Sequence, residues 1–166
     1  VISSVKNLLK KINKLNGFNI LHQFASNVGS LKLGLQSKNL KQVYNSDLLY
    51  LVNCDEVSIN KNDDQFIIYQ GSHGGENSTI ADVVLPSSSY TEKNGSFVNL
   101  EGRVQKSYKS SYPPGFAKDD WEIFSIIADS NNIDLGFKNF NELRKKMVSE
   151  YPVSYTHLTL PTTRHV

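Results

Sequence analysis

Cysteine is nearly absent from this sequence, since Cys54 is the only one among its 166 residues. A single thiol excludes an intrachain disulfide, a cysteine-ligated iron–sulfur cluster and a cysteine-type zinc site within the chain. Because no disulfide has to form, a reducing compartment is the natural expectation for the protein.

Long apolar runs and a strong charge of either sign are also missing. No apolar stretch approaches the ~20 residues that span a bilayer, and the first residues lack the basic start and apolar middle of a signal peptide. The 18 basic and 16 acidic residues leave a net charge of +2, and only three of the basic residues are arginine. So small a net charge indicates neither a nucleic-acid-binding surface nor a polybasic membrane segment. We therefore expect no nucleic-acid partner and no direct membrane insertion.

Two helical patterns are expected at the start of the chain. Apolar residues follow three- and four-residue steps over residues 2–15, with lysines on the other side, and Asn16-Gly17 ends the pattern. A second helix is predicted over residues 19–34, and we expect the two helices to pack as a pair. Because Val1 falls in what reads as the middle of a helix, and is not methionine, we expect a missing upstream portion.

Short apolar runs predict strands in the middle of the chain. Leu48–Val52 is a continuous apolar run and is predicted to be a central strand. Phe66–Tyr69 and Ala81–Leu85 are rich in β-branched residues, end at Gly or Pro, and have the length of buried strands. Short extended pieces are expected around Phe97–Leu100 and Val104, with turns at Asn94-Gly95 and Glu101-Gly102.

The last third of the chain begins with a segment rich in Ser, Tyr and Pro, residues 106–118, which we expect to be a surface arm. Asp119-Asp120 then predict the start of a helix that docks on the sheet. A final helix is expected from about Asn141, with its basic cluster Arg144-Lys145-Lys146 in solvent.

We interpret residues 1–151 as a fragment of one α/β domain. Residues 152–166 break from that pattern, because they form no helical stripe and turn abruptly to threonine. Their run VSYTHLTLPTT looks like a conceptual translation of sequencing-adapter sequence, so we expect a tail without an evolved role. His157 and His165 are therefore excluded from any site.

Three features suggest chemistry, and each has a structural alternative that we favour. Cys54, Asp55 and Glu56 follow a strand at its carboxyl end, where α/β sheets place ligand-binding groups, but they also read as a small buried cysteine beside solvated carboxylates. The loop Gly71–Thr79 has glycines that let N–H groups converge on an anion, yet it lacks the spacing of a dinucleotide fingerprint or a P-loop. We therefore favour a flexible connection between strands. The Asn-x-Ser/Thr patterns at Asn77 and Asn94 are interpreted as chance.

The remaining polar candidates also lack a complete site. His73 has no nucleophile in a recognisable elbow beside it, and His22 has no second ligand at metal spacing. The polar residues of the central segment are candidates for catalysis because their charges are expected to converge; they are Asp82, Glu92, Lys93, Glu101 and Arg103. A structural role is favoured, with Glu101 and Arg103 pinning a turn through a charge-assisted hydrogen bond. We predict no catalytic, cofactor-binding or metal-ligating residue in this chain.

Several stretches, taken together, resemble a known family. They are IIYQGSHGG, IADVVLPSSSYTEKNGSFVNLEGRVQ and YPPGFAKDDWEI, preceded by NILHQFASNVGSLKLG. In this order and spacing they resemble the C-terminal region of the large iron–sulfur subunit of respiratory complex I, which is the 75 kDa subunit in mitochondria and the G subunit in bacteria. The segment around ADVVLP is shared with the wider superfamily of molybdopterin oxidoreductases.

The resemblance implies a partial molybdopterin-oxidoreductase-type α/β domain, with a mostly parallel sheet flanked by helices. It implies a place in the peripheral arm of NADH:quinone oxidoreductase, on the matrix side of the mitochondrial inner membrane or the cytoplasmic side of a bacterial one. Other peripheral-arm subunits would be its partners. The parent subunit would carry iron–sulfur clusters upstream, and this segment would hold no cofactor and serve assembly.

Two alternatives stay open on the sequence alone. The chain could be a fragment of a molybdenum- or tungsten-pterin oxidoreductase, such as a formate dehydrogenase, whose loop Gly71–Thr79 touches cofactor. It could also be a free-standing interaction domain outside electron transfer. Bound pterin or metal in the parent would favour the first, and an upstream cysteine-rich frame would exclude the second.

Overall fold

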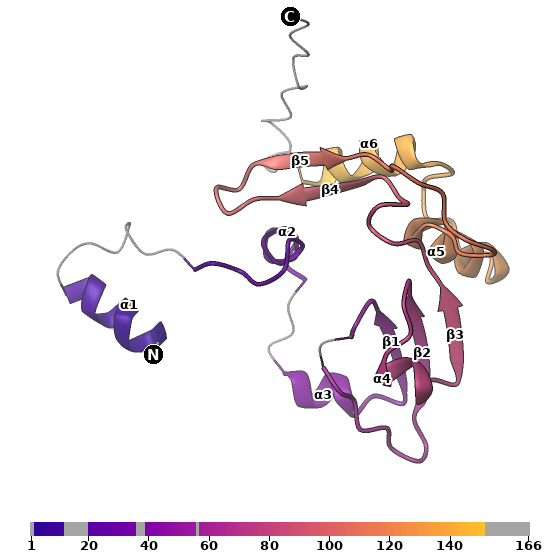
Figure 1. The fold of residues 1–166 in the computed structure, drawn as a ribbon, viewed down its shortest axis with the longest axis horizontal. Coiled ribbons are helices and arrows are strands. Elements are labelled where there is room, and N and C mark those ends of the chain that lie inside the picture. The colour runs from indigo at the N-terminus through magenta and orange to yellow at the C-terminus, as the bar shows by residue number, and fades with distance from the viewer. Residues whose placement is uncertain (1, 12–19, 36–38, 56, 152–166) are drawn as a thin grey trace, which may run out of the picture.

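The computed structural model describes residues 2–11, 20–35, 39–55 and 57–151. Outside these ranges lie Glu56, a part of the first predicted helix, and the whole predicted tail with His157 and His165. The described elements are arranged as mixed α and β structure (Figure 1). In chain order they are α1 (Ile2–Lys11), α2 (Asn27–Lys32), α3 (Leu40–Tyr44), β1 (Leu48–Val52), β2 (Phe66–Gly71), α4 (Glu76–Thr79), β3 (Val83–Pro86), β4 (Gly95–Val98), β5 (Val104–Ser107), α5 (Asp120–Ser130) and α6 (Phe140–Glu150).

A parallel three-stranded sheet in the order β1-β2-β3 forms the centre of the fold, which confirms the predicted α/β class. Its core consists of side chains that alternate along the first two strands, joined by one residue of the connecting loop, and the members are Leu49, Leu51, Ile59, Ile67 and Tyr69. The three predicted strands are therefore confirmed, each to within two residues at either end.

The prediction that Leu48–Val52 is a central strand is wrong for the described sheet, because β2 lies between β1 and β3. The reason is visible in the burial of β1. Leu49 and Leu51 face the core at 6% exposure each, whereas Leu48 and Val52 are 57% and 41% exposed. A continuous apolar run indicates burial on both faces only when neighbouring elements cover both, and sequence alone does not count those neighbours.

The hairpin β4-β5 forms a second, antiparallel sheet in which Phe97 pairs with Gln105. Its turn is built on Asn99, whose side chain accepts a hydrogen bond from the Arg103 N–H at 2.8 Å. Gly102 has a φ of +84°, a left-handed conformation that favours glycine. The predicted turn at Glu101-Gly102 is thus confirmed, while Gly95 begins a strand instead of lying in a turn.

The start of the chain differs from the prediction. The second helix covers only Asn27–Lys32, and the chain before it is turn and irregular structure. This helix packs on β4, where Gly29 lies against the Val98 side chain, and α1 stands apart from it (Figure 1). The predicted helix pair is therefore wrong, because the apolar residues of this segment find a partner in the distant hairpin.

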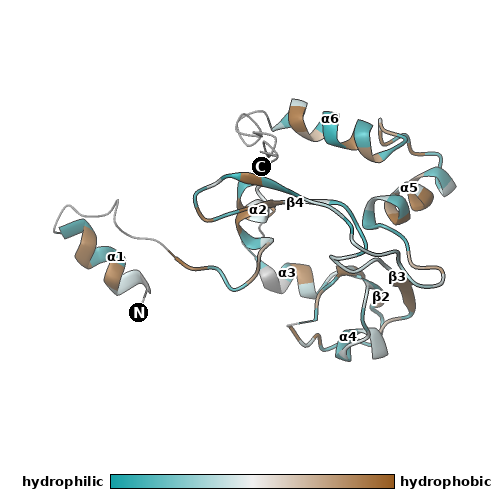
Figure 2. Ribbon diagram, turned by 45° about the horizontal axis from the view of Figure 1, so that its top comes forward, coloured by the Kyte–Doolittle hydropathy of each residue, from teal (hydrophilic) through white to brown (hydrophobic). Residues whose placement is uncertain are grey.

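The two C-terminal helices form as predicted. Asp119 caps α5 in a reciprocal capping box with Glu122, and Phe124 stacks on Tyr50 of β1 at 5.4 Å between ring centroids, so α5 docks on the sheet. The basic cluster of α6 is only partly in solvent, because the Arg144 guanidinium lies over the Phe140 ring. Figure 2 shows apolar and hydrophilic segments alternating along α1 and α6. Among the described helices, none combines the length and hydropathy needed to cross a membrane.

Candidate functional site at the carboxyl edge of the sheet

The carboxyl ends of the parallel strands bring together the features that the sequence singled out. Cys54 and Asp55 follow β1, the loop with His73 follows β2, and Ser87 and Ser88 follow β3. Parallel strands end at one edge of a sheet, and α/β proteins place their ligand sites there. This edge is therefore where a ligand or a reactant would be expected to bind.

Tyr69 fills the space beneath the glycine loop. Its side chain is 1% exposed, and its hydroxyl contacts both the Asp55 carboxylate and the His73 backbone oxygen, the latter at 2.8 Å. A Cβ at Gly71 would lie 2.5 Å from the Tyr69 oxygen, so only glycine fits at position 71. The glycine is required by a tyrosine of the same chain and leaves no opening for a ligand at that point.

Two contacts at Gly75 disfavour an anionic ligand at that point of the loop. The Gly75 N–H already donates to the Ser78 hydroxyl at 3.1 Å. The Asp55 carboxylate oxygen lies 3.2 Å from the Cβ position of Gly75, and a second anion there would be repelled. A short helix, α4, continues directly from the loop, so this segment is a hydrogen-bonded connection between β2 and β3.

His73 and Ser72 lie side by side on the surface, with the Ser72 hydroxyl 3.0 Å from the histidine Nδ1. Both are exposed. A nucleophilic pair needs a third group that orients the base, and the Asp55 carboxylate, which lies beside the loop at Gly75, contacts the Tyr69 hydroxyl instead. The arrangement has no assembled triad.

Asn77 is a structural residue that sequence reasoning missed. It is 2% exposed, accepts a hydrogen bond from the Ile59 N–H at 3.1 Å, and donates to the Cys54 and Val57 carbonyls at 2.6 and 2.7 Å. The sequence signal at this position was a glycosylation pattern, but the nitrogen that would carry a glycan is used to hold the loop between β1 and β2. The interpretation of that pattern as chance agrees with this geometry.

A second polar cluster joins the sheet to α5. Gln70 is fully buried, accepts from the Tyr50 hydroxyl at 2.6 Å, and donates to the Asp120 carboxylate at 2.7 Å. Lys93 forms an ion pair with the other oxygen of Asp120. Burial, and secondarily the negative charge of Asp120, raise the pKa of Tyr50 above its usual value, so this hydroxyl remains a donor at neutral pH. Three elements, β1, β2 and α5, and the turn before β4 are thus tied by one series of polar contacts.

The five polar candidates of the central segment do not converge. Lys93 binds Asp120, while Glu92 accepts from the Ser89 N–H at 2.9 Å. Asp82, directly before β3, forms an ion pair with Lys61 of the connection between β1 and β2. The Glu101 carboxylate is 3.5 Å from the Asn99 amide. The turn predicted to depend on Glu101 and Arg103 is held by the Asn99 side chain instead. The expectation that these charges gather at one point was wrong.

Asp82 gives a prediction about acid stability. Its carboxylate accepts hydrogen bonds from Lys61 at 2.6 Å and from the Ile67 N–H at 2.7 Å. These bonds hold its pKa below the usual 3.8, and the bond from Lys61 has the larger effect. A depressed pKa in the folded state stabilises the fold above the unfolded pKa, and this stabilisation is lost as pH falls through the folded value. Urea unfolding from about pH 5 to pH 2.5 should therefore show a steeper loss of stability for the unmodified chain than for Asp82→Asn. Identical slopes would contradict the assignment, and Asp63→Asn, which changes an exposed aspartate in the connection before β2, is the matched control.

Metal binding has no support in the described part of the chain, where no three His, Cys, Asp or Glu side chains are grouped to hold an ion. Cys54 packs against the core cluster in a part-buried position, as the structural interpretation expects.

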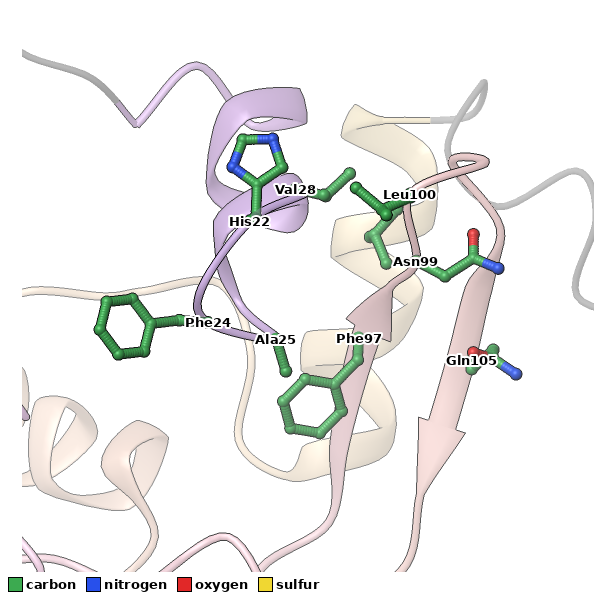
Figure 3. A pocket seen from close by; sticks show the side chains of 9 residues that line it. His22, Phe24, Ala25, Val28, Phe97, Asn99, Leu100 and Gln105 are labelled. Atoms are coloured by element: carbon green, nitrogen blue, oxygen red, sulfur yellow. The ribbon is translucent and has the colours of Figure 1, made fainter. Parts of the chain in front are cut away.

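His22 lines a small apolar pocket of about 230 Å³ between the segment before α2 and the hairpin, with Phe24 and Phe97 (Figure 3). The histidine thus lies beside an aliphatic and aromatic surface.

The comparisons with known proteins identify the family. The family model for molybdopterin oxidoreductase matches residues 1–130. The NADH-ubiquinone oxidoreductase 75 kDa subunit of Reclinomonas americana is 40% identical over 162 residues, 92% of this chain and 23% of that protein. The G subunit of the NADH-quinone oxidoreductase of Rickettsia felis is 44% identical over 138 residues, 82% of this chain and 20% of that protein.

A fungal relative extends the same pattern. The mitochondrial NADH-ubiquinone oxidoreductase 78 kDa subunit of Candida albicans is 39% identical over 134 residues, which cover 80% of this chain and 18% of that protein. The chain therefore spans less than a quarter of the length of the curated relatives named here. The motifs, the parallel sheet and these matches agree, and the chain belongs to the molybdopterin oxidoreductase family, among the relatives of the 75 kDa and G subunits of NADH:quinone oxidoreductase.

Proposed function

We propose that this chain is part of a large subunit of respiratory NADH:quinone oxidoreductase, and that its region serves packing and assembly in a complex that moves electrons from NADH to quinone. The relatives carry the names of such subunits. The parent subunit would hold iron–sulfur clusters outside this segment, because one cysteine supplies no cluster.

The observation that carries the packing role is that five polar side chains at the carboxyl edge of the sheet bind within the fold, although the buried Ser87 hydroxyl of the same edge has no hydrogen-bond partner among the described residues. In a cofactor enzyme this edge would offer free donors and acceptors to a ligand. Here Tyr69 and Asp55 occupy the space under the glycine loop, and Gln70, Asp120 and Lys93 bind one another. These residues hold the β–loop–α arrangement together instead of facing a reactant.

The proposal includes a place beside other subunits of the peripheral arm. The complex would present this region on the matrix side of the mitochondrial inner membrane or on the cytoplasmic side of a bacterial one, without insertion. The organism of origin decides between the two, and the relatives come from both kinds of source.

A single variant tests assembly against catalysis. Lys93→Met in the parent subunit removes the ion pair with Asp120, so we expect less assembled complex, while the complex that remains keeps its turnover per iron–sulfur cluster and its cluster spectra. Lys138→Met, at an exposed position before α6, is the control and should assemble normally. Reduced turnover in a fully assembled Lys93→Met complex would overturn the packing role.

Elemental analysis separates this function from that of a pterin-dependent oxidoreductase. We expect iron in the purified parent complex, and neither molybdenum nor tungsten in stoichiometric amount. Stoichiometric molybdenum or tungsten, together with pterin fluorescence, would reject the proposal.

A further inference from the structure

A long segment between β5 and α5 presents aromatic side chains to solvent. Residues 106–118, here called the aromatic arm, include the last residues of β5 and then run as a loop toward α5 (Figure 1). Phe116 is 92% exposed, Tyr112 79% and Tyr108 66%, and the neighbouring Tyr90 is 73% exposed. Large aromatic side chains rarely cluster on a surface without a binding role.

The aromatic arm is held at both ends by backbone hydrogen bonds. The Ser110 N–H donates to the Thr91 carbonyl at 2.8 Å, and the Ser88 N–H donates to the Lys118 carbonyl at 2.9 Å. Pro113-Pro114 restricts the backbone between these anchors, and Gly115 turns it with a φ of +55°. A fixed loop loses less conformational entropy on binding than a free one, so these aromatic residues are preorganised for contact.

The charge of the aromatic arm is positive. It contains Lys106, Lys109 and Lys118 and no acidic residue, and the Lys109 ammonium lies 4.6 Å from the centre of the Tyr112 ring. The acidic residues that follow, Asp119 and Asp120, are engaged with Ser88 and Lys93 inside the fold. The surface that the arm offers therefore combines aromatic side chains with lysine.

We propose that the aromatic arm docks on an acidic surface with an apolar pocket on a neighbouring subunit of the complex, and that Phe116 enters the pocket. This inference rests on the proposed function. Exposed tyrosine and phenylalanine on a fixed loop match the anchors of protein interfaces, and the lysines match an acidic rim. A nucleic acid or a membrane is disfavoured, because the chain as a whole carries a net charge of only +2.

Photo-crosslinking from position 116 tests the partner directly. Phe116 is replaced by p-benzoylphenylalanine in the parent subunit, the complex is assembled and irradiated, and the linked peptides are identified. We expect links to an acid-rich stretch of another subunit. Links to the same polypeptide, to lipid or to nucleic acid, or no link in an assembled complex, would overturn the inference. The same probe at Leu21, which is 83% exposed and outside the arm, is the control for accidental contact.

Two further variants test the two parts of the surface. Phe116→Ser should speed dissociation of the subunit roughly 10- to 30-fold, as loss of an interface anchor does. Reversing the charge of Lys109 and Lys118 to glutamate should slow association and abolish the slowing of association by added salt. The same change at Lys10 and Lys11 of α1 alters the net charge equally and is the matched control. Normal kinetics for both arm variants would reject the inference.

The outcomes distinguish failure of the inference from failure of the proposed function. If the parent subunit does not co-purify with an NADH:quinone oxidoreductase at all, the proposed function fails and the inference fails with it. If the subunit co-purifies but position 116 links to no neighbouring subunit, the inference alone fails. Because Phe116 is almost fully exposed, its replacement by serine should leave the fold intact, and an unchanged unfolding curve of the variant verifies this.

Discussion

Replacing Asn77 with alanine is expected to lower the free energy of unfolding by about 3 to 5 kcal/mol, because three buried backbone groups lose their partners together. The Ile59 N–H and the Cys54 and Val57 carbonyls lie in the loop that connects β1 to β2. An unsatisfied buried polar group costs about 1 to 3 kcal/mol, and small domains have only about 5 to 15 kcal/mol in total. The variant should therefore be largely unfolded at moderate urea.

The measurement is equilibrium urea unfolding followed by the fluorescence of Trp121, the only tryptophan of the chain. Asn60→Ala is the matched control, because Asn60 belongs to the same connection but is exposed, and it should change stability by less than about 0.5 kcal/mol. Asn77→Asp tests the direction of the bonds, since a carboxylate keeps the acceptor for Ile59 but has no N–H for the two carbonyls. Equal stability of the alanine variant and the unmodified chain would refute the anchoring role.

Replacing Gln70 with leucine is expected to cost about 2 to 3 kcal/mol, although leucine is close to glutamine in volume. The amide is fully buried and is the link between the Tyr50 hydroxyl and the Asp120 carboxylate. Its loss leaves the hydroxyl beside an apolar group and weakens the hold of α5 on the sheet. The loss in unfolding free energy is again measured with urea.

A double-mutant cycle isolates the hydrogen bond in this prediction. Tyr50→Phe alone removes the donor and should cost about 1 kcal/mol, because the ring still stacks on Phe124. The double variant should lose about 0.5 to 1 kcal/mol less unfolding free energy than the sum of the two single losses, since the two side chains share one bond. Strictly additive costs would show that Tyr50 and Gln70 act independently.

The candidate site shows how far sequence reasoning extends. Gly71, His73 and Asp55 were recognised as neighbours of strand ends, because strand ends follow from local hydrophobicity. The contact of Tyr69 with Asp55 was not foreseen, since it joins a residue of β2 to one in the connection after β1. Gln70, Asn77 and Ser88 were overlooked for the same reason: each is buried only because distant backbone or side-chain groups satisfy its polar atoms.

Among the helices, too, the locally determined feature was predicted correctly and the one that depends on distant contacts was not. Asp119-Asp120 marked the start of α5 correctly, because a cap acts within one turn of the helix. The predicted helix over residues 19–34 was too long, since its apolar residues pack on β4 and an irregular backbone before Asn27 serves that contact. Periodicity records which residues are apolar but does not state which surface they meet.

The sequence by itself determined the strands, the start of α5, the turn at Gly102 and the family, because these depend on local stereochemistry and on motifs that are read in order. The tertiary structure alone decided that β2 is the central strand of the described sheet, that Tyr69 fills the glycine loop, and that Asp82, Lys93 and Glu101 lie apart. The physical reason is the range of the interactions. Hydrophobic period and backbone conformation are set within a few residues, whereas the burial and pairing of a polar group depend on segments brought together only by the complete fold.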